Sequence, residues 1–310
     1  MRAFVERPAV IDLLLALWPL FALIVGGYAL RRRGFPSEGF WPGADRLNYF
    51  VLFPALLFHN LATAPLDNPA LPRLAAAVML GLGIAWCALL LGRRLRGWPA
   101  ARFGALAQGI LRFNTYLGLA AVGSLFGPKG LSLAALMLAL MVPTVNLMSV
   151  WALTAERGVG VRELLVPVLK NPLILACLGG ALVNLLGLPL PGGSERLLSL
   201  LAAASLPLGL LCVGAALRPQ ELGGEASALA WSCALRLLGM PLLAFVVGRV
   251  LQLPSMESAV LVLFFALPTA PTAYALTRQL GGDAHLMAGV ITLQTLLGAA
   301  SLPLVLILLV

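Results

Sequence analysis

Long apolar stretches, separated by short charged or Gly/Pro-rich gaps, run along the whole chain of 310 residues. A helix that crosses a membrane needs about 20 mostly apolar residues, and ten stretches come near that length. They cover residues 10–30, 45–63, 72–92, 102–126, 130–153, 169–187, 195–217, 226–252, 257–279 and 284–309. The pattern predicts an all-α integral membrane protein with ten transmembrane helices and the lipid bilayer as its surroundings.

Composition agrees with this pattern. The chain is 61% hydrophobic and 11% charged, and the gaps are too short for a soluble domain, so function is expected within the bilayer or at its surface. The net charge of +9 is attributed to basic residues facing the cytoplasm, and no nucleic-acid partner is expected. The cysteines stand singly among apolar neighbours, so neither a metal nor a cofactor is predicted.

The distribution of Lys and Arg predicts the orientation. Most basic residues fall in the gaps after the first, third, fifth, seventh and ninth stretches, as Arg31, Arg94, Arg157 and Arg218 illustrate. The positive-inside rule places these gaps in the cytoplasm. We therefore expect a multi-pass protein of the plasma (inner) membrane with both termini extracytoplasmic.

The two halves of the chain match weakly when Pro54 is laid on Pro207. The segment FPALLFHNLA then falls on LPLGLLCVGA, and Asn114 falls on Pro268. Each half holds five predicted helices, an odd number, so the second half must cross the membrane in the opposite sense. Inverted repeats of this kind are typical of secondary transporters, whose sites lie near the midplane where discontinuous helices meet.

The ninth stretch contains two helix breakers, Pro268 and Pro271, each followed by a threonine. A proline inside a helix costs about 3 kcal/mol, and backbone groups freed at membrane depth need protein or a wet cavity around them. In the fourth stretch the break is expected at Asn114-Thr115, whose side chains compete for backbone hydrogen bonds. Half-helix amino ends facing inward would suit a carboxylate. Ordinary kinks are the alternative interpretation.

Several motifs recur in one known family. They are FVLFPALLFHNLA, FNTYLGL, VNLMSVWALTAE, LKNPLILACLGGALVNLLGLPLP, LPLGLLCVGAAL and LPTAPTAYALTRQLGGDAHLMAGVITLQTLLGAASLPL. Over nearly its whole length the chain resembles the auxin efflux carrier family, which includes bacterial malonate and other organic-acid permeases and the plant PIN-type auxin carriers. The last motif is the most specific.

This resemblance implies a fold like that of the bile-acid symporters and sodium–proton exchangers, with crossing, broken fourth and ninth helices. Helices one, two, six and seven would form a scaffold through which a homodimer could assemble, and helices three to five and eight to ten would move past it as an elevator. The resemblance also places Asn114 near the substrate carboxylate. The family often has Gly-x-Pro just after this asparagine, where this chain has Gly118-Leu119-Ala120.

The expected organisation has three parts. Residues 1–153 form the first five-helix repeat, residues 154–168 a cytoplasmic linker, and residues 169–310 the second, inverted repeat. In this scheme each repeat contributes two helices to the scaffold and three to the moving group.

Several polar residues stand inside the predicted helices. A charge at the depth of Arg112 needs wet or polar surroundings: either it draws an organic anion into the site, or it snorkels or caps exposed carbonyls, and both interpretations stay open. Asn146 fits the family pattern and is expected at the site. His59 and Asn60, near Pro54, are expected to line the scaffold side of the cavity, although a packing role for His59 is the commoner case. A structural role is favoured for Arg236, and Gln294 is expected to bond across helices.

The predicted function is a carrier of a small organic anion, a carboxylate in the first place, driven outward by the membrane potential. Sodium- or proton-coupled symport is the alternative, and a non-transporting sensor or complex subunit is a further one. No acidic residue falls in the middle of a predicted helix, and no catalytic motif predicts an enzyme. The candidate binding residues are Asn114, Thr115, Pro268, Thr269, Pro271, Thr272, Asn146, Arg112, His59 and Asn60.

Overall fold

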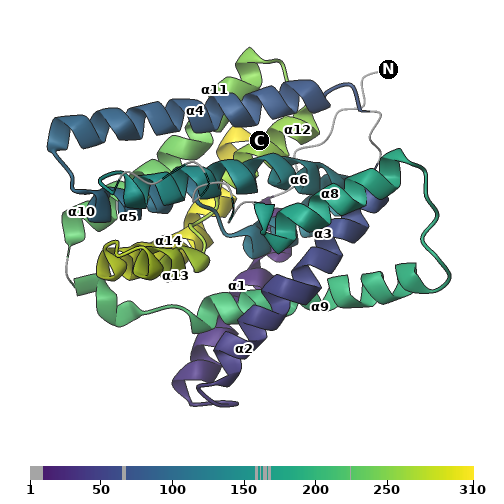
Figure 1. The fold of residues 1–310 in the computed structure, drawn as a ribbon, viewed down its shortest axis with the longest axis horizontal. Coiled ribbons are helices and arrows are strands. Elements are labelled where there is room, and N and C mark those ends of the chain that lie inside the picture. The colour runs from purple at the N-terminus through teal and green to yellow at the C-terminus, as the bar shows by residue number, and fades with distance from the viewer. Residues whose placement is uncertain are drawn as a thin grey trace.

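The computed structural model describes residues 10–64, 68–157, 160, 162, 166, 169–223 and 225–310, and Figure 1 shows its fold. The described elements are all helical. In chain order they are α1 (Val10–Arg32), α2 (Phe40–Leu47), η1 (Asn48–Leu52), α3 (Phe53–Ala62), α4 (Leu71–Arg96), α5 (Ala100–Leu111), α6 (Thr115–Thr154), α8 (Pro172–Leu185), α9 (Ser194–Ala215), η2 (Pro219–Gly223), α10 (Ala226–Ala234), η3 (Leu235–Gly239), α11 (Met240–Val250), α12 (Ser255–Ala266), α13 (Thr272–Gln279) and α14 (Ala284–Leu309).

Among the described residues, six helical segments are long and apolar enough to cross a membrane by length and composition. They are Ile11–Arg32, Leu71–Arg96, Ala100–Thr154, Ser194–Ala215, Ala226–Val250 and Ala284–Leu309. Two shorter apolar helices, α8 and α12, add to them. The predicted all-helical membrane architecture is thus confirmed at this coarser level. Much of the predicted 154–168 linker lies outside the described residues.

A single glycine divides α6 into two helical arms. Gly127 has φ 58° and ψ −153°, a backbone conformation that side chains with a Cβ rarely adopt. The arms, 115–126 and 128–154, match the gap expected between the fourth and fifth stretches. The first arm can therefore point its amino end into the molecule while the second runs on as a separate helix.

The helices pack in two groups. In one group α1 packs on α9, and α3 packs on both α8 and α9 (Figure 1). In the other, α4, α5, α6, α11, α12 and α14 pack together, with α4 running across the upper part of the view. The cavity described below lies where the two groups meet.

Glycines allow α1 and α9 to approach until their main chains touch. A Cβ added at Gly214 would lie 1.7 Å from the carbonyl oxygen of Ile24, and one added at Gly27 would lie 1.9 Å from that of Leu211. Small residues at a contact are the usual means of close helix packing in membranes. Any side chain at either position would push the two helices apart.

Both helices that were expected to break are interrupted. α5 ends at Leu111, Arg112 is extended with φ −71° and ψ 152°, and α6 starts at Thr115. The break therefore covers residues 112–114, slightly earlier than the predicted Asn114-Thr115. It forms without a proline, because the Asn114 side chain caps the new helix by accepting a hydrogen bond from Leu117 N–H at 3.1 Å.

The second interruption, between α12 and α13, contains the two prolines, and Leu267 leaves the helix with φ −66° and ψ 144°. The two interruptions are joined by a main-chain hydrogen bond. Asn114 N–H donates to the Pro268 carbonyl oxygen at 2.8 Å. The backbone groups that each break frees are thus satisfied in part by the other break.

Candidate functional site

A cavity of about 330 Å³ lies against both interruptions. Its wall combines side chains from α2 and η1, from the first interruption, from the second arm of α6, from α9 and from α13. These segments are far apart in the sequence and come from both packing groups. The cavity is large enough for a small organic molecule.

Arg112 lies in this cavity and connects the two interruptions. Its guanidinium donates to Asn146 Oδ1 at 2.8 Å and to Thr272 Oγ1 at 3.3 Å. Among the described residues it has no carboxylate partner within ion-pair distance. A guanidinium held by two neutral oxygens keeps its full positive charge, so the cavity favours a negatively charged guest.

Asn114 lines the same cavity and carries a buried side-chain donor. The residue is 1% exposed, and its Oδ1 must face Leu117 N–H, so its Nδ2 points the other way. Within the described part of the chain, Nδ2 has no hydrogen-bond partner, and neither do Tyr116 Oη and Trp41 Nε1, which belong to the same lining. A buried donor without an acceptor is costly, so these groups are suited to bind an acceptor-rich ligand.

The other predicted residues divide into those at the cavity and those behind it. Thr115 and Pro271 line it. Thr269 is fully buried away from it, where its N–H donates to Gln294 Oε1 at 2.9 Å and its hydroxyl to the Gln108 carbonyl oxygen at 3.0 Å. Pro268 lies outside the cavity lining, and its carbonyl oxygen accepts the hydrogen bond from Asn114 N–H that joins the two interruptions.

His59 and Asn60 lie on α3, outside the cavity lining. The wall on this side is instead formed earlier in the same helical run, by Trp41, Asp45 and Tyr49. His59 Nδ1 and Asn60 Nδ2 are buried and have no hydrogen-bond partner among the described residues.

Arg236 supports the crossing from behind. It is 1% exposed, and its guanidinium donates to the carbonyl oxygens of Leu267 at 2.5 Å, Ile110 at 2.7 Å and Phe264 at 3.1 Å. These carbonyls belong to the carboxyl ends of α5 and α12. A cation is stabilising there because it faces the negative ends of two helix dipoles and the orphan carbonyls.

Gln294 bonds across helices, as expected for this polar residue. Besides accepting from Thr269 N–H, it donates through Nε2 to the Gly109 carbonyl oxygen at 2.9 Å and to Ser232 Oγ at 3.2 Å. It thereby ties α14 to both interrupted helices and to α10.

Sequence reasoning missed several cavity residues. Asp45, Tyr49, Arg31, Arg218 and Tyr274 all line the cavity. Asp45 is the first residue of the second predicted stretch, yet the helix that contains it begins earlier, at Phe40, and Asp45 lines the cavity. Only the packing of α2 against α9 could have revealed this.

An all-helical architecture rich in membrane-length helices, with a cavity at two broken helices, is typical of multi-pass membrane transport proteins. Residues 161–306 match the family model described as Membrane transport protein. Over 290 residues the chain is also 28% identical to an uncharacterized transporter from Methanothermobacter thermautotrophicus, covering 92% of this chain and 94% of that protein. By both comparisons the chain is similar to membrane transport proteins, in agreement with the family resemblance seen in the motifs.

Proposed function

We propose that this protein carries a small organic anion, with at least one carboxylate, across the membrane by alternating access. The observation that carries the proposal is the cationic Arg112, which lines the cavity next to Asn114 and has no acidic partner among the residues that the structure describes. A carboxylate has two acceptor oxygens, which can engage a guanidinium and an amide together.

The helix ends add to this preference. α6 starts at Thr115 and α13 at Thr272, and both residues line the cavity. The free N–H groups at a helix start and its partial positive charge favour an anion. Pro271 and Asn146 complete the wall around the same space.

The proposed mechanism moves one packing group past the other. α1, the α2–α3 run, α8 and α9 serve as the scaffold, and the remaining helices carry the site as an elevator. We propose ten spans in two inverted repeats, residues 1–153 and 169–310, with both termini outside the inner membrane. The grouping of the helix contacts supports this division. A homodimer would form through the scaffold helices.

Efflux driven by the membrane potential needs no coupled ion, because the negative cell interior favours anion exit by about 2.3 kcal/mol per charge per 100 mV. To test this, the purified protein is reconstituted in liposomes loaded with labelled malonate, and efflux is measured under imposed potentials. Efflux should rise as the interior becomes more negative and should vanish in Arg112→Gln. Arg96→Gln, at an exposed arginine outside the cavity, is the control.

Proton-coupled transport is a second candidate because Asp45 lines the same cavity as Arg112. A carboxylate there could bind a proton as the anion passes. Under this scheme a pH gradient drives malonate flux at zero potential, and Asp45→Asn uncouples the flux from pH while exchange of malonate for malonate continues. Flux that follows a sodium gradient instead would support sodium symport. A protein that binds malonate but never moves it would fit a sensor.

A further inference from the structure

Two arginines stand where three hollows meet. Arg31, at the end of α1, and Arg218, just after α9, line the central cavity, a second hollow of about 390 Å³ and a third of about 110 Å³. The second hollow includes the exposed Arg32 and Gln220, so it lies at the protein surface. A solute entering the central cavity from this surface would pass both guanidinium groups.

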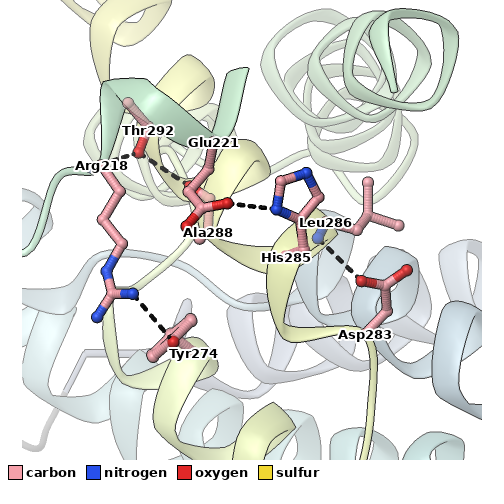
Figure 2. Close-up of polar contacts among 8 residues, drawn as sticks. All are labelled: Arg218, Glu221, Tyr274, Asp283, His285, Leu286, Ala288 and Thr292. Carbon is pink, nitrogen blue, oxygen red and sulfur yellow. Dashed lines mark hydrogen bonds and ion pairs between the residues drawn. The ribbon is translucent and has the colours of Figure 1, made fainter. Parts of the chain in front are cut away.

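Arg218 is held so that its charge stays available. Its backbone N–H donates to Thr292 Oγ1 at 2.9 Å, which fixes the chain, and its guanidinium donates to Tyr274 Oη at 3.1 Å, with Cζ 4.4 Å from the ring centroid (Figure 2). No other side-chain hydrogen bond of Arg218 occurs within the described residues. Because a guanidinium has five N–H donors, most remain free for a ligand.

Glu221, three residues after Arg218, does not pair with it. Figure 2 shows the Glu221 carboxylate turned toward His285 Nδ1, with which it is in contact, while the Arg218 guanidinium turns toward Tyr274. No ion pair between Arg218 and an acidic side chain is formed in the described part of the chain. The contact with His285 thus engages the Glu221 carboxylate, which would otherwise compete with an anionic ligand for the Arg218 guanidinium.

The guanidinium of Arg31 is also available to an anionic ligand. Its guanidinium donates to the Ala215 carbonyl oxygen at the end of α9, and it lies 3.7 Å from Glu38. That pair is solvent-accessible, with 38% and 73% of the two side chains exposed. Exposed ion pairs of this kind contribute little to stability, so another anion can replace Glu38 as the partner of Arg31.

We propose that Arg31 and Arg218 form an outer carboxylate-binding station, at which the anion binds on its way between the surface hollow and the inner site at Arg112. This inference rests on the proposed function. The station is a specificity device: it concentrates anions at one face and repels cations before they reach the cavity. It affects only anions that enter or leave the cavity through the face where α1 and α9 end.

The test uses membrane vesicles of the two opposite orientations and labelled malonate. Arg218→Gln and Arg31→Gln should each raise the half-saturating concentration about tenfold when malonate enters from the hollow face, and less than about twofold from the opposite face. Arg218→Lys and Arg31→Lys, which keep the charge, should restore most of the loss. Arg96→Gln is the control for a charge change alone, and gel filtration in detergent verifies folding.

Equal effects from both faces, or none from either, would overturn the outer station. The same outcome leaves the proposed function standing if the unmodified protein transports malonate. If the unmodified protein transports neither malonate nor other small carboxylates, the proposed function fails first. Failure of the lysine variants to restore the affinity would indicate packing roles and also count against the station.

Discussion

The two interrupted helices solve the same structural problem with different chemistry. The first break, at residues 112–114, holds a cation and an amide that face the cavity. The second holds prolines and the buried Thr269, and its freed backbone groups bond to Gln294 and Arg236. The first break thus supplies binding groups, whereas the second mainly supplies the geometry in which those groups are presented. Arg112 and Arg236, one on each side of the crossing, make the contrast testable.

The largest effect is expected from replacing these two arginines by methionine. Arg236→Met leaves three buried carbonyls without their donor and should lower the free energy of unfolding by about 3 kcal/mol or more. Arg112→Met removes an unpaired charge and should leave stability unchanged or improved while abolishing malonate binding. Thermal unfolding in detergent, with and without malonate, measures both. The reverse pattern would refute the division of roles.

A large effect on binding alone is expected from Asn114→Asp. Aspartate can still cap α6, so stability should change by less than about 1 kcal/mol. The free N–H donor is replaced by a carboxylate oxygen that repels an anion, so malonate affinity should fall about a hundredfold or more. Equilibrium binding to the purified protein measures this. Unchanged affinity would remove Asn114 from the site.

Gln294→Leu tests the supporting side of the crossing. The substitution removes the partners of Thr269 N–H and the Gly109 carbonyl group and should destabilise the protein by about 2 kcal/mol. Because Gln294 lies outside the cavity lining, affinity at a temperature where the variant is folded should change less than about threefold. A strong loss of affinity without loss of stability would contradict its supporting role.

The smallest effect is expected from Thr272→Val. This isosteric change removes the weaker of the two side-chain acceptors of Arg112, at 3.3 Å, and leaves Asn146 in place. Malonate affinity should change by about threefold, with stability unaffected. Asn146→Leu, at the shorter contact, is the comparison and should have the larger effect. Equal effects would mean that Arg112 is held by the cavity wall as a whole.

Local chemistry explains which features could be predicted from the sequence. Pro268 and Pro271 break a helix through their own covalent structure, and the match to the first half predicted the break near Asn114. Arg112 could not be placed, because its direction depends on an extended backbone that the Asn114–Pro268 hydrogen bond between distant segments helps to stabilise. Thr269 also could not be placed from its position alone: it stands beside a break, yet its side chain is buried in the protein and does not line the cavity.

The second helical run shows the opposite limitation. His59 and Asn60 attract attention as polar residues deep in an apolar segment, but the cavity is reached by Asp45 and Tyr49, about three to four turns nearer the start. Which end of a helix approaches a cavity depends on how that helix tilts against its neighbours. Contacts of this kind between distant segments leave no local pattern, and for the same reason Arg31 and Arg218 could not be assigned.

The main-chain contact of α1 with α9 limits how the molecule can change shape. Where Gly27 and Gly214 stand, carbonyl groups and backbone replace the side-chain layer that normally lets neighbouring helices glide. A shift of one helix along the other would drive adjacent side chains into these atoms. α1 and α9 therefore behave as one rigid unit. Any opening or closing of the cavity has to take place where this helix pair contacts α6 and α14.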